Sequence, residues 1–269
     1  MPDIYATITE ADAAILEQLA ALLELRASDP QQREMRETYF GDLELQPDTL
    51  AVEIGCGTGA VTRALAAHSQ VAEAVGVDPS PVFLEKAREL AQDAADVTFL
   101  EGDARELPLE DASAGLVVFH TTLCHLPAPE RALTEARRVL RDDGQLAVFD
   151  GDYATATLAT GDHDPLQACA DAAMAFLVHD RFLVRKLPAL LESTGFQLVK
   201  LRGHSYVESP ASLGYMLAIA ERGAAALLGA GRIGAAAAEA LEEEAHRRSD
   251  EREFFGHIAY VSVVAQKRK

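Results

Sequence analysis

The middle of the chain alternates between short apolar runs and longer stretches with apolar residues at helical spacing. Apolar runs of about four to eight residues bounded by turn residues predict buried strands, and the periodic stretches between them predict helices. The strands are expected at 50–54, 73–77, 97–100, 115–120, 145–149, 196–207 and 257–265. The helices are expected at 8–25, 31–40, 59–68, 80–94, 129–140, 165–179, 181–193, 211–228 and 233–249. This alternation predicts βαβ units, and hence an α/β fold with a largely parallel sheet.

Three segments lie outside the alternation. Residues 1–45 are predicted to form an N-terminal helical cap on a domain that spans 46–269. Two helical insertions, near 151–180 and 209–256, are predicted to cover a pocket, because they connect to strand ends that face a ligand in open α/β sheets. Side chains of the N-terminal segment could also reach that ligand, although each alone is more often a solvated or core residue: Tyr5, Arg26, Arg36 and Tyr39.

The first strand runs directly into three alternating glycines, Gly55, Gly57 and Gly59. Such a turn lets the backbone approach a ligand where a Cβ would clash, and it directs the N–H groups of the next helix toward that ligand. Glu53 lies inside the apolar strand, where an unpaired carboxylate is costly to bury. The pattern therefore indicates a ligand site at this turn. It does not identify the ligand, because Gly55, Gly57 and Ala60 also fit the dinucleotide fingerprint G-x-G-x-x-G/A.

Glu53 and the glycines resemble the first motif of class I S-adenosylmethionine-dependent methyltransferases, Glu/Asp-x-Gly-x-Gly-x-Gly. Further motifs follow in the order of that family. Asp78 ends the second strand, Gly102 and Asp103 follow the third, and the segment at 125–127, His-Leu-Pro, resembles the ubiquinone- and menaquinone-biosynthesis type. The helix and strand at 136–148 are similar too, although Arg-Asp-Asp stands where Lys-Pro-Gly is usual. The resemblance covers about 50–207 and 257–265, and implies a doubly wound, seven-stranded, mostly parallel sheet.

The resemblance also implies roles for individual residues toward S-adenosylmethionine. The glycine turn would line the methionine moiety, Asp78 would take the ribose hydroxyls, and Asp103 would accept from the adenine amino group. Glu53 would order the glycine loop. The full set of cofactor-binding residues expected on this basis is Glu53, Gly55, Cys56, Gly57, Gly59, Asp78, Pro79, Ser80, Gly102, Asp103, Ala104, His120, Thr121 and His125.

Methyl transfer from a sulfonium is an in-line displacement, in which the protein positions the acceptor and manages its proton. An oxygen or nitrogen acceptor of high pKa benefits from a general base. The candidates near the expected pocket are His120, Asp152, Tyr153 and His163. The predicted function is methylation of a small molecule at oxygen, nitrogen or carbon. The alternatives are an NAD(P)-dependent oxidoreductase, in which Glu53 and Asp103 would have no role, and a protein that binds S-adenosylmethionine without methylating.

The amino-acid composition limits the classes of binding partner that are expected. The net charge of −19 repels polyanions, so a nucleic acid substrate is not expected. Cys56, Cys124 and Cys169 are far apart, which argues against a disulfide framework or a zinc site and fits a reducing compartment. No metal site is expected at 162–164, Asp-His-Asp, because adjacent side chains seldom converge. The chain shows neither a targeting signal nor a run of about 18 apolar residues, so a cytoplasmic protein without a membrane partner is expected. The sequence leaves a homodimer open.

Overall fold

The computed structural model describes residues 3, 5, 8–94, 96–209 and 212–268. In this part of the chain seven strands form one sheet in the order β3-β2-β1-β4-β5-β7-β6. The strands are β1 (Thr49–Ile54), β2 (Val71–Asp78), β3 (Val97–Glu101), β4 (Ala114–His120), β5 (Leu140–Thr157), β6 (Phe196–Val207) and β7 (His257–Lys267). All neighbours pair in parallel except β7, which is antiparallel to both β5 and β6. The predicted seven-stranded, mostly parallel sheet is confirmed.

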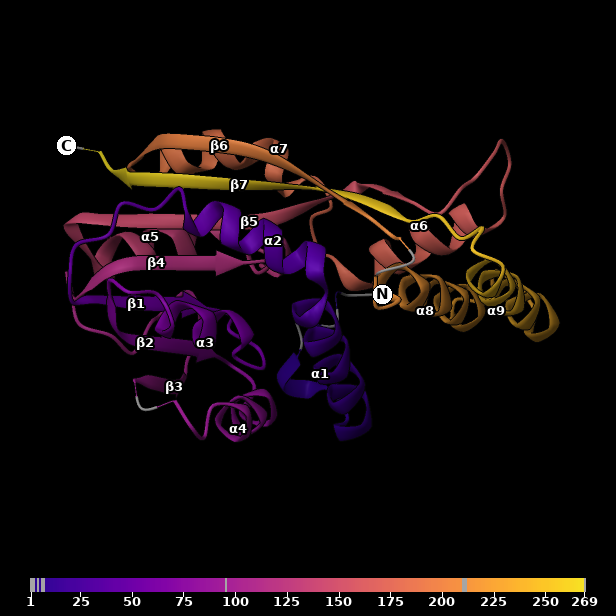
Figure 1. Ribbon diagram of the computed structural model, residues 1–269, viewed down its shortest axis with the longest axis horizontal. Helices are drawn as coiled ribbons and strands as arrows, with labels where there is room; N and C mark the ends of the chain where they lie inside the picture. The colour runs from indigo at the N-terminus through magenta and orange to yellow at the C-terminus, as the bar shows by residue number, and fades with distance from the viewer. Residues whose placement is uncertain (1–2, 4, 6–7, 95, 210–211, 269) are drawn as a thin grey trace.

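Helices lie beside this sheet and at one end of it (Figure 1). The α-helices are α1 (Ala13–Ser28), α2 (Pro30–Phe40), α3 (Ala60–Ala66), α4 (Pro81–Leu90), α5 (Pro129–Val139), α6 (Leu166–Leu177), α7 (Leu183–Ser193), α8 (Tyr215–Gly229) and α9 (Ala235–Asp250), with short 3-10 helices at Ile8–Glu10 and Leu123–His125. Each predicted helix is present, with ends shifted by a few residues. The predicted first residue of α8, at 211, lies outside the described residues.

Strand β5 is much longer than the predicted strand at 145–149. Strand β5 continues through Thr157, so the first part of the expected insertion at 151–180 belongs to the sheet. The composition of 151–157 is turn-like, but Gly151 pairs with Tyr260 and Asp152 with Ala259 across β7. Pairing with a partner strand that is distant in sequence thus overrides the local preference.

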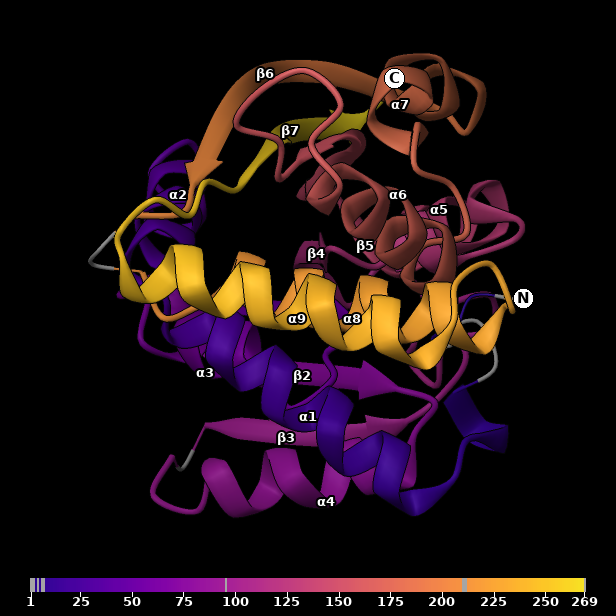
Figure 2. The same cartoon turned by 90° about the vertical axis from the view of Figure 1, so that its right-hand side faces the viewer.

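The insertions gather at one end of the sheet. Helices α6, α8 and α9 lie there, beyond the long strands β5, β6 and β7 (Figure 1), and the view onto this end shows α8 and α9 running across it (Figure 2). Helix α8 approaches α6 closely, because a Cβ added at Gly223 would lie 2.0 Å from the carbonyl oxygen of Cys169. The two insertions therefore form one packed unit.

The N-terminal segment is fastened to the same end of the sheet. The buried side chain of Asp29 caps α2 by accepting from the N–H groups of Gln31 and Gln32, and it accepts from the Tyr206 hydroxyl of β6 at 3.0 Å. Gln31 Nε2 donates to the carbonyl oxygen of Val207 at 2.6 Å. These contacts fix where α1 and α2 stand relative to the strand ends.

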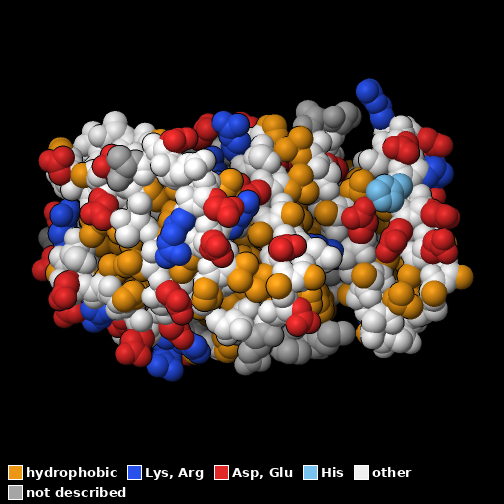
Figure 3. Space-filling view, turned by 90° about the horizontal axis from the view of Figure 1, so that it is seen from below, with side chains coloured by type: hydrophobic (Ala, Val, Ile, Leu, Met, Phe, Trp, Pro, Cys, Tyr) orange, Lys and Arg blue, Asp and Glu red, His pale blue; other side chains and the backbone are white. Residues whose placement is uncertain are grey.

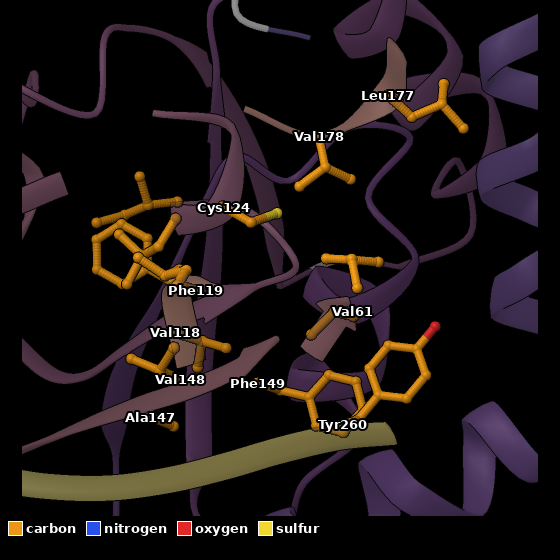
Figure 4. Close-up of a cluster of buried hydrophobic side chains, with 14 of the residues drawn as sticks. Val61, Val118, Phe119, Cys124, Ala147, Val148, Phe149, Leu177, Val178 and Tyr260 are labelled. Carbon is orange, nitrogen blue, oxygen red and sulfur yellow. The ribbon is translucent and has the colours of Figure 1, made fainter. Parts of the chain in front are cut away.

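The core lies along the central strands. Val118 and Phe119 of β4 and Val148 and Phe149 of β5 are fully buried, and the rings of Phe149 and Tyr260 stack with centroids 5.1 Å apart (Figure 4). Near-continuous apolar strands of this kind are typical of sheets covered on both faces. This core gives the strand ends a rigid base.

The net charge of −19 places many acidic side chains on the surface. On the face seen from below, acidic side chains are spread over the surface (Figure 3). Among the described residues, no helix has the length and apolarity that crossing a membrane requires.

Candidate functional site

A cavity of about 330 Å³ opens at the carboxyl ends of β1, β2, β3 and β4. Open α/β sheets bind ligands at this edge, and the size is in the range of small-molecule pockets, roughly 300–1,000 Å³. Its wall brings together the N-terminal helices, the predicted motif turns and helices α6 and α8. The predicted site residues that line it are Glu53, Gly55, Cys56, Gly57, Asp78, Pro79, Gly102, Asp103, Ala104, His120, Thr121, His125 and Tyr153.

The glycine turn needs glycine for steric reasons. Gly55 has φ +72°, and a Cβ there would lie 2.3 Å from Cγ2 of Thr122. Gly59 has φ +76° at the start of α3, and a Cβ there would lie 2.6 Å from the Phe99 ring. The turn therefore packs closely against Thr122 and Phe99. Gly55 and Gly57 line the cavity, whereas Gly59 does not.

Asp78 ties the glycine turn to the end of β2. Its Oδ2 accepts from the N–H of Gly57 at 2.8 Å, and its Oδ1 accepts from the N–H of Ser80 at 2.9 Å. Burial raises the pKa of this carboxyl to about 6. Each oxygen has a lone pair left for a further donor in the cavity. Ser80 does not line the cavity, and its hydroxyl caps α4 by accepting from the N–H of Phe83.

Glu53 is a second buried carboxyl beneath the turn. Thr62 donates a hydrogen bond to its Oε2. Burial raises the pKa of Glu53 to about 8, and the nearby Asp78 acts in the same direction, while the Thr62 bond opposes both. Most of this carboxyl is therefore protonated at pH 7 in the ligand-free protein.

Asp103 faces the outer part of the cavity. Arg105 donates to its carboxylate through Nη2 at 2.6 Å and Nε at 2.9 Å, and this ion pair lowers the pKa of Asp103. The pair is partly exposed. Gly102 and Ala104 on either side of Asp103 also line the cavity, so the loop after β3 presents both backbone and carboxylate to it.

His120 ends β4 at the base of the cavity. Its Nδ1 is hydrogen-bonded to the Tyr39 hydroxyl at 3.0 Å, and its ring stacks on Phe149 with centroids 4.6 Å apart. Burial lowers its pKa well below the ordinary value, and the cationic Arg26 and Arg36 add to the effect. The imidazole is therefore neutral at physiological pH, held in place by rings from α2 and β5.

Thr121 occupies a strained position next to His120. Its φ is +54°, which is rare for a β-branched residue. Its hydroxyl donates to the carbonyl oxygen of His120 and accepts from Nη2 of Arg26, both at 2.7 Å. The chain thus turns sharply where β4 meets the cavity, and α1 braces the turn.

Two guanidinium groups line the cavity without an anionic partner. Arg26 of α1 and Arg36 of α2 form no salt bridge with any described carboxylate. Arg26 was identifiable in principle, because it stands four residues after Leu22 and seven after Leu19 on the buried stripe of α1. A cation on an apolar stripe indicates a ligand or a buried partner.

Two of the four predicted bases lie away from the cavity. Asp152 points elsewhere and pairs with Arg185 at 2.8 Å. His163 is exposed on the loop before α6, with φ +61°. Asp152 lies in the extension of β5 that pairs with β7, and His163 lies on the loop beyond it. The sequence did not reveal this extension. His120 and Tyr153 remain as cavity residues, and burial raises the pKa of the Tyr153 phenol well above its ordinary value.

The sequence also did not reveal the wall opposite the glycine turn. It is apolar and comes from the insertions: Met174, Leu177, Val178, Tyr215 and Ile219. Nothing in their local pattern distinguishes them from core positions. No group of three or more His, Cys, Asp or Glu suited to a metal ion occurs within the described ranges.

Comparison with known proteins agrees with this geometry. Residues 52–148 match the family model of a methyltransferase domain. The chain is 30% identical to an uncharacterized 37.1 kDa protein in transposon TN4556 of Streptomyces fradiae, over 69% of this chain and 54% of that protein. It is 33% identical to demethylmenaquinone methyltransferase of Staphylococcus aureus, over 45% of this chain and 50% of that enzyme. The chain thus spans about half the length of the curated relatives it matches.

A solved structure shares the fold. The crystal structure of a putative methyltransferase from Bacillus halodurans superposes with a TM-score of 0.62 at 19% identity, over 87% of this chain and 99% of that one. The matched residues 52–148 contain the end of β1, all of β2 to β4, the turns after these strands and the first half of β5. Most of the predicted site residues on the cavity wall lie among them. Residues 52–148 are therefore similar to a methyltransferase domain, and they form the central part of this fold.

Proposed function

We propose that the chain transfers a methyl group from S-adenosylmethionine to a small-molecule acceptor. The observation that carries the proposal is the meeting of the glycine turn, Asp78, Asp103 and His120 in one cavity at the strand ends. Glu53 and Asp103 have no assigned role in a nicotinamide-dependent oxidoreductase, and both line this cavity. The proposal therefore explains residues that the alternative leaves unused.

The cavity suits the chemistry of S-adenosylmethionine. The lone pairs of Asp78 match a pair of ribose hydroxyls, and the unpaired Arg36 matches a carboxylate. Glu53 and Asp78 place carboxyl oxygens beside the glycine turn, where a cationic amino group would favour their ionised forms. The bound cofactor supplies an activated methyl group on a sulfonium.

The residues of this chain would act mainly by positioning. His120 is neutral, but its depressed pKa makes it a weak base, and Tyr39 occupies one of its two nitrogens. Holding an acceptor in line with the methyl group needs no strong base when the acceptor is already nucleophilic. His120 and Tyr153 then serve to orient the acceptor and to exclude water. The insertions, through α6 and α8, close the acceptor side.

Binding is the first test. S-adenosylhomocysteine should bind by calorimetry and should raise the melting temperature, since a ligand at 100 times its Kd adds about 2.7 kcal/mol to the stability. NADH serves as the matched nucleotide control. Stabilisation by NADH without binding of S-adenosylhomocysteine would contradict the proposal. Consumption of labelled methyl donor in the presence of candidate acceptors then separates catalysis from binding alone.

The role of the insertions has its own test. Hydrogen exchange in α6 and α8 should slow when S-adenosylhomocysteine and an acceptor are both bound, because these helices would close on the acceptor. Exchange in β4 serves as the internal reference. Unchanged exchange in both helices would mean that the insertions are static packing.

A further inference from the structure

The cavity contains more cationic charge than the cofactor uses. Arg26 and Arg36 both line it, and neither pairs with a described carboxylate. The third arginine on the wall, Arg105, is already held by Asp103. Removing a guanidinium from water without an anionic partner is costly, so each free arginine calls for an anion in the ligand-bound protein.

The two free arginines serve different ends of the cavity. Arg36 interacts electrostatically with Glu53, under the glycine turn, and with Tyr39. Arg26 donates to Thr121, at the turn after β4. The pKa of His120, which lies between the two ends, responds to both arginines. Arg36 is therefore on the side of the glycine turn, and Arg26 is on the side of the insertions.

Aromatic and apolar groups surround Arg26. The phenols of Tyr5, Tyr153 and Tyr215 lie within electrostatic range of its guanidinium, and all three line the cavity. Burial raises the pKa of Tyr5 to about 12 and raises that of Tyr153 well above its ordinary value, so these two phenols are neutral and do not balance the charge. The wall continues with apolar side chains of α6 and α8, among them Met174 and Ile219.

A hydrogen bond holds the Arg26 guanidinium in a fixed orientation, but most of its N–H donors have no protein acceptor among the described residues. One nitrogen, Nη2, donates to Thr121, and its other donors have no recorded partner among the described residues. These nitrogen atoms are not among the described polar atoms that are buried without a hydrogen-bond partner, so they remain accessible from the cavity. The protein as a whole carries a net charge of −19, so its long-range field does not attract anions, and recognition of one requires a local cation such as this.

On this basis we propose that the methyl acceptor is a carboxylate with an aromatic or otherwise apolar body, and that Arg26 anchors its carboxylate. S-adenosylmethionine has a single carboxylate, which the proposed function assigns to Arg36, so the anion at Arg26 must come from the acceptor. A guanidinium matches a carboxylate in shape and charge. The apolar wall of α6 and α8 would take the body of the acceptor. This inference rests on the proposed function.

The test compares acids with their amides on the complex with S-adenosylhomocysteine. The probes are 1-naphthoate and 4-hydroxybenzoate, each paired with its neutral amide, which keeps the shape and removes the charge. In the wild-type protein at least one acid should bind about tenfold more tightly than its amide, by calorimetry and thermal shift. In Arg26→Gln the ratio should fall to about one, while the affinity for S-adenosylhomocysteine stays within about twofold of the wild type.

Two further variants keep the test interpretable. Arg222→Gln removes the same charge from α8, where Arg222 donates to the carbonyl of Gln18 outside the cavity wall, and it should keep the acid preference. Arg26→Lys keeps the charge without the planar fork and should retain a reduced preference, which covers the case that Arg26→Gln does not fold.

The outcomes separate the two proposals. No binding of S-adenosylhomocysteine to the wild type would refute the proposed function itself. Binding of S-adenosylhomocysteine with equal affinity for each acid and its amide would overturn only the acceptor assignment. A loss of cofactor affinity in Arg26→Gln as large as that in Arg36→Gln would place Arg26 at the cofactor and would also overturn it.

Discussion

Replacing Asp78 by Asn should change stability and cofactor affinity in opposite directions. Burial raises the pKa of this carboxyl from 3.8 to about 6. A shift of about two units means that ionised Asp78 costs the ligand-free fold about 3 kcal/mol at neutral pH. Asn removes this charge but can accept from only one of the N–H groups of Gly57 and Ser80, which costs about 1 kcal/mol. The variant should therefore be roughly 1–2 kcal/mol more stable than the wild type at pH 7.

The stability difference between Asp78→Asn and the wild type should depend on pH, in a direction that follows from the raised pKa of Asp78. The folded pKa lies above the unfolded value, so the protonated form stabilises the fold. The contribution of Asp78 is fully present below pH 3.8 and is lost as the pH rises through about 6. The advantage of Asp78→Asn should therefore shrink when urea unfolding of the ligand-free proteins is repeated at pH 4.5. Asp93→Asn, at an exposed position of the loop after α4, is the control for charge removal alone.

Affinity should change the other way. A carboxylate that accepts from the ribose hydroxyls makes charge-assisted bonds of about 1.5–3 kcal/mol each, so Asp78→Asn should weaken binding of S-adenosylhomocysteine at least tenfold. Calorimetry measures this directly. Unchanged affinity would remove Asp78 from the site, and a variant less stable by the same amount at both pH values would show that the burial argument is wrong.

Three further predictions concern packing and protonation. Gly223→Ala should lower the melting temperature clearly, because its Cβ meets a backbone carbonyl of α6, whereas Gly229→Ala, with open space around the site, should not. Glu53→Gln should gain stability relative to the wild type as the pH rises from 4.5 to 8, since the contribution of Glu53 is fully present below its ordinary pKa of 4.5 and is lost by the time the pH passes the folded value of about 8; melting curves at each pH decide. The ring protons of His120 should show no titration between pH 6 and 8 by NMR, and Tyr39→Phe should cost about 1 kcal/mol in urea unfolding. A midpoint near 6.5 would contradict the depressed pKa.

Local pattern predicted most of the elements. Every predicted strand is present because apolar runs bounded by turn residues have few other stable conformations in a large core. The length of β5 was not predicted, since its extension to Thr157 depends on pairing with β7, about a hundred residues later. The positions of Asp152 and His163 away from the cavity follow from the same extension, which places Asp152 inside the strand and His163 on the loop after it. A side chain near a strand end can be placed only when the length of the strand is known.

The part of the cavity that the glycine turn, Asp78 and Asp103 form was the most predictable part of the site. The glycine turn, Asp78 and Asp103 each follow a strand directly, and parallel strands end at one edge of the sheet, so the order of motifs along the chain already implies that they meet. The sequence also indicated Arg26 and Arg36 as side chains that could reach a ligand. Only Arg26, on the apolar stripe of α1, stands in a pattern that distinguishes it from an ordinary surface arginine.

The part of the cavity wall that α1, α6 and α8 form, where we propose that the acceptor binds, was decided by tertiary structure alone. Helices α1, α6 and α8 come from distant parts of the chain, and only their packing over the strand ends brings Arg26 within electrostatic range of Tyr153 and Tyr215. Local sequence fixes the period of a helix and its apolar face, but not the distant element that this face will meet. The sequence by itself thus determined the sheet, the order of its motifs and the strand edge at which the predicted motif turns meet. The free guanidinium within a tyrosine-lined pocket arose from long-range packing, because no local pattern encodes which buried cation is left without a partner.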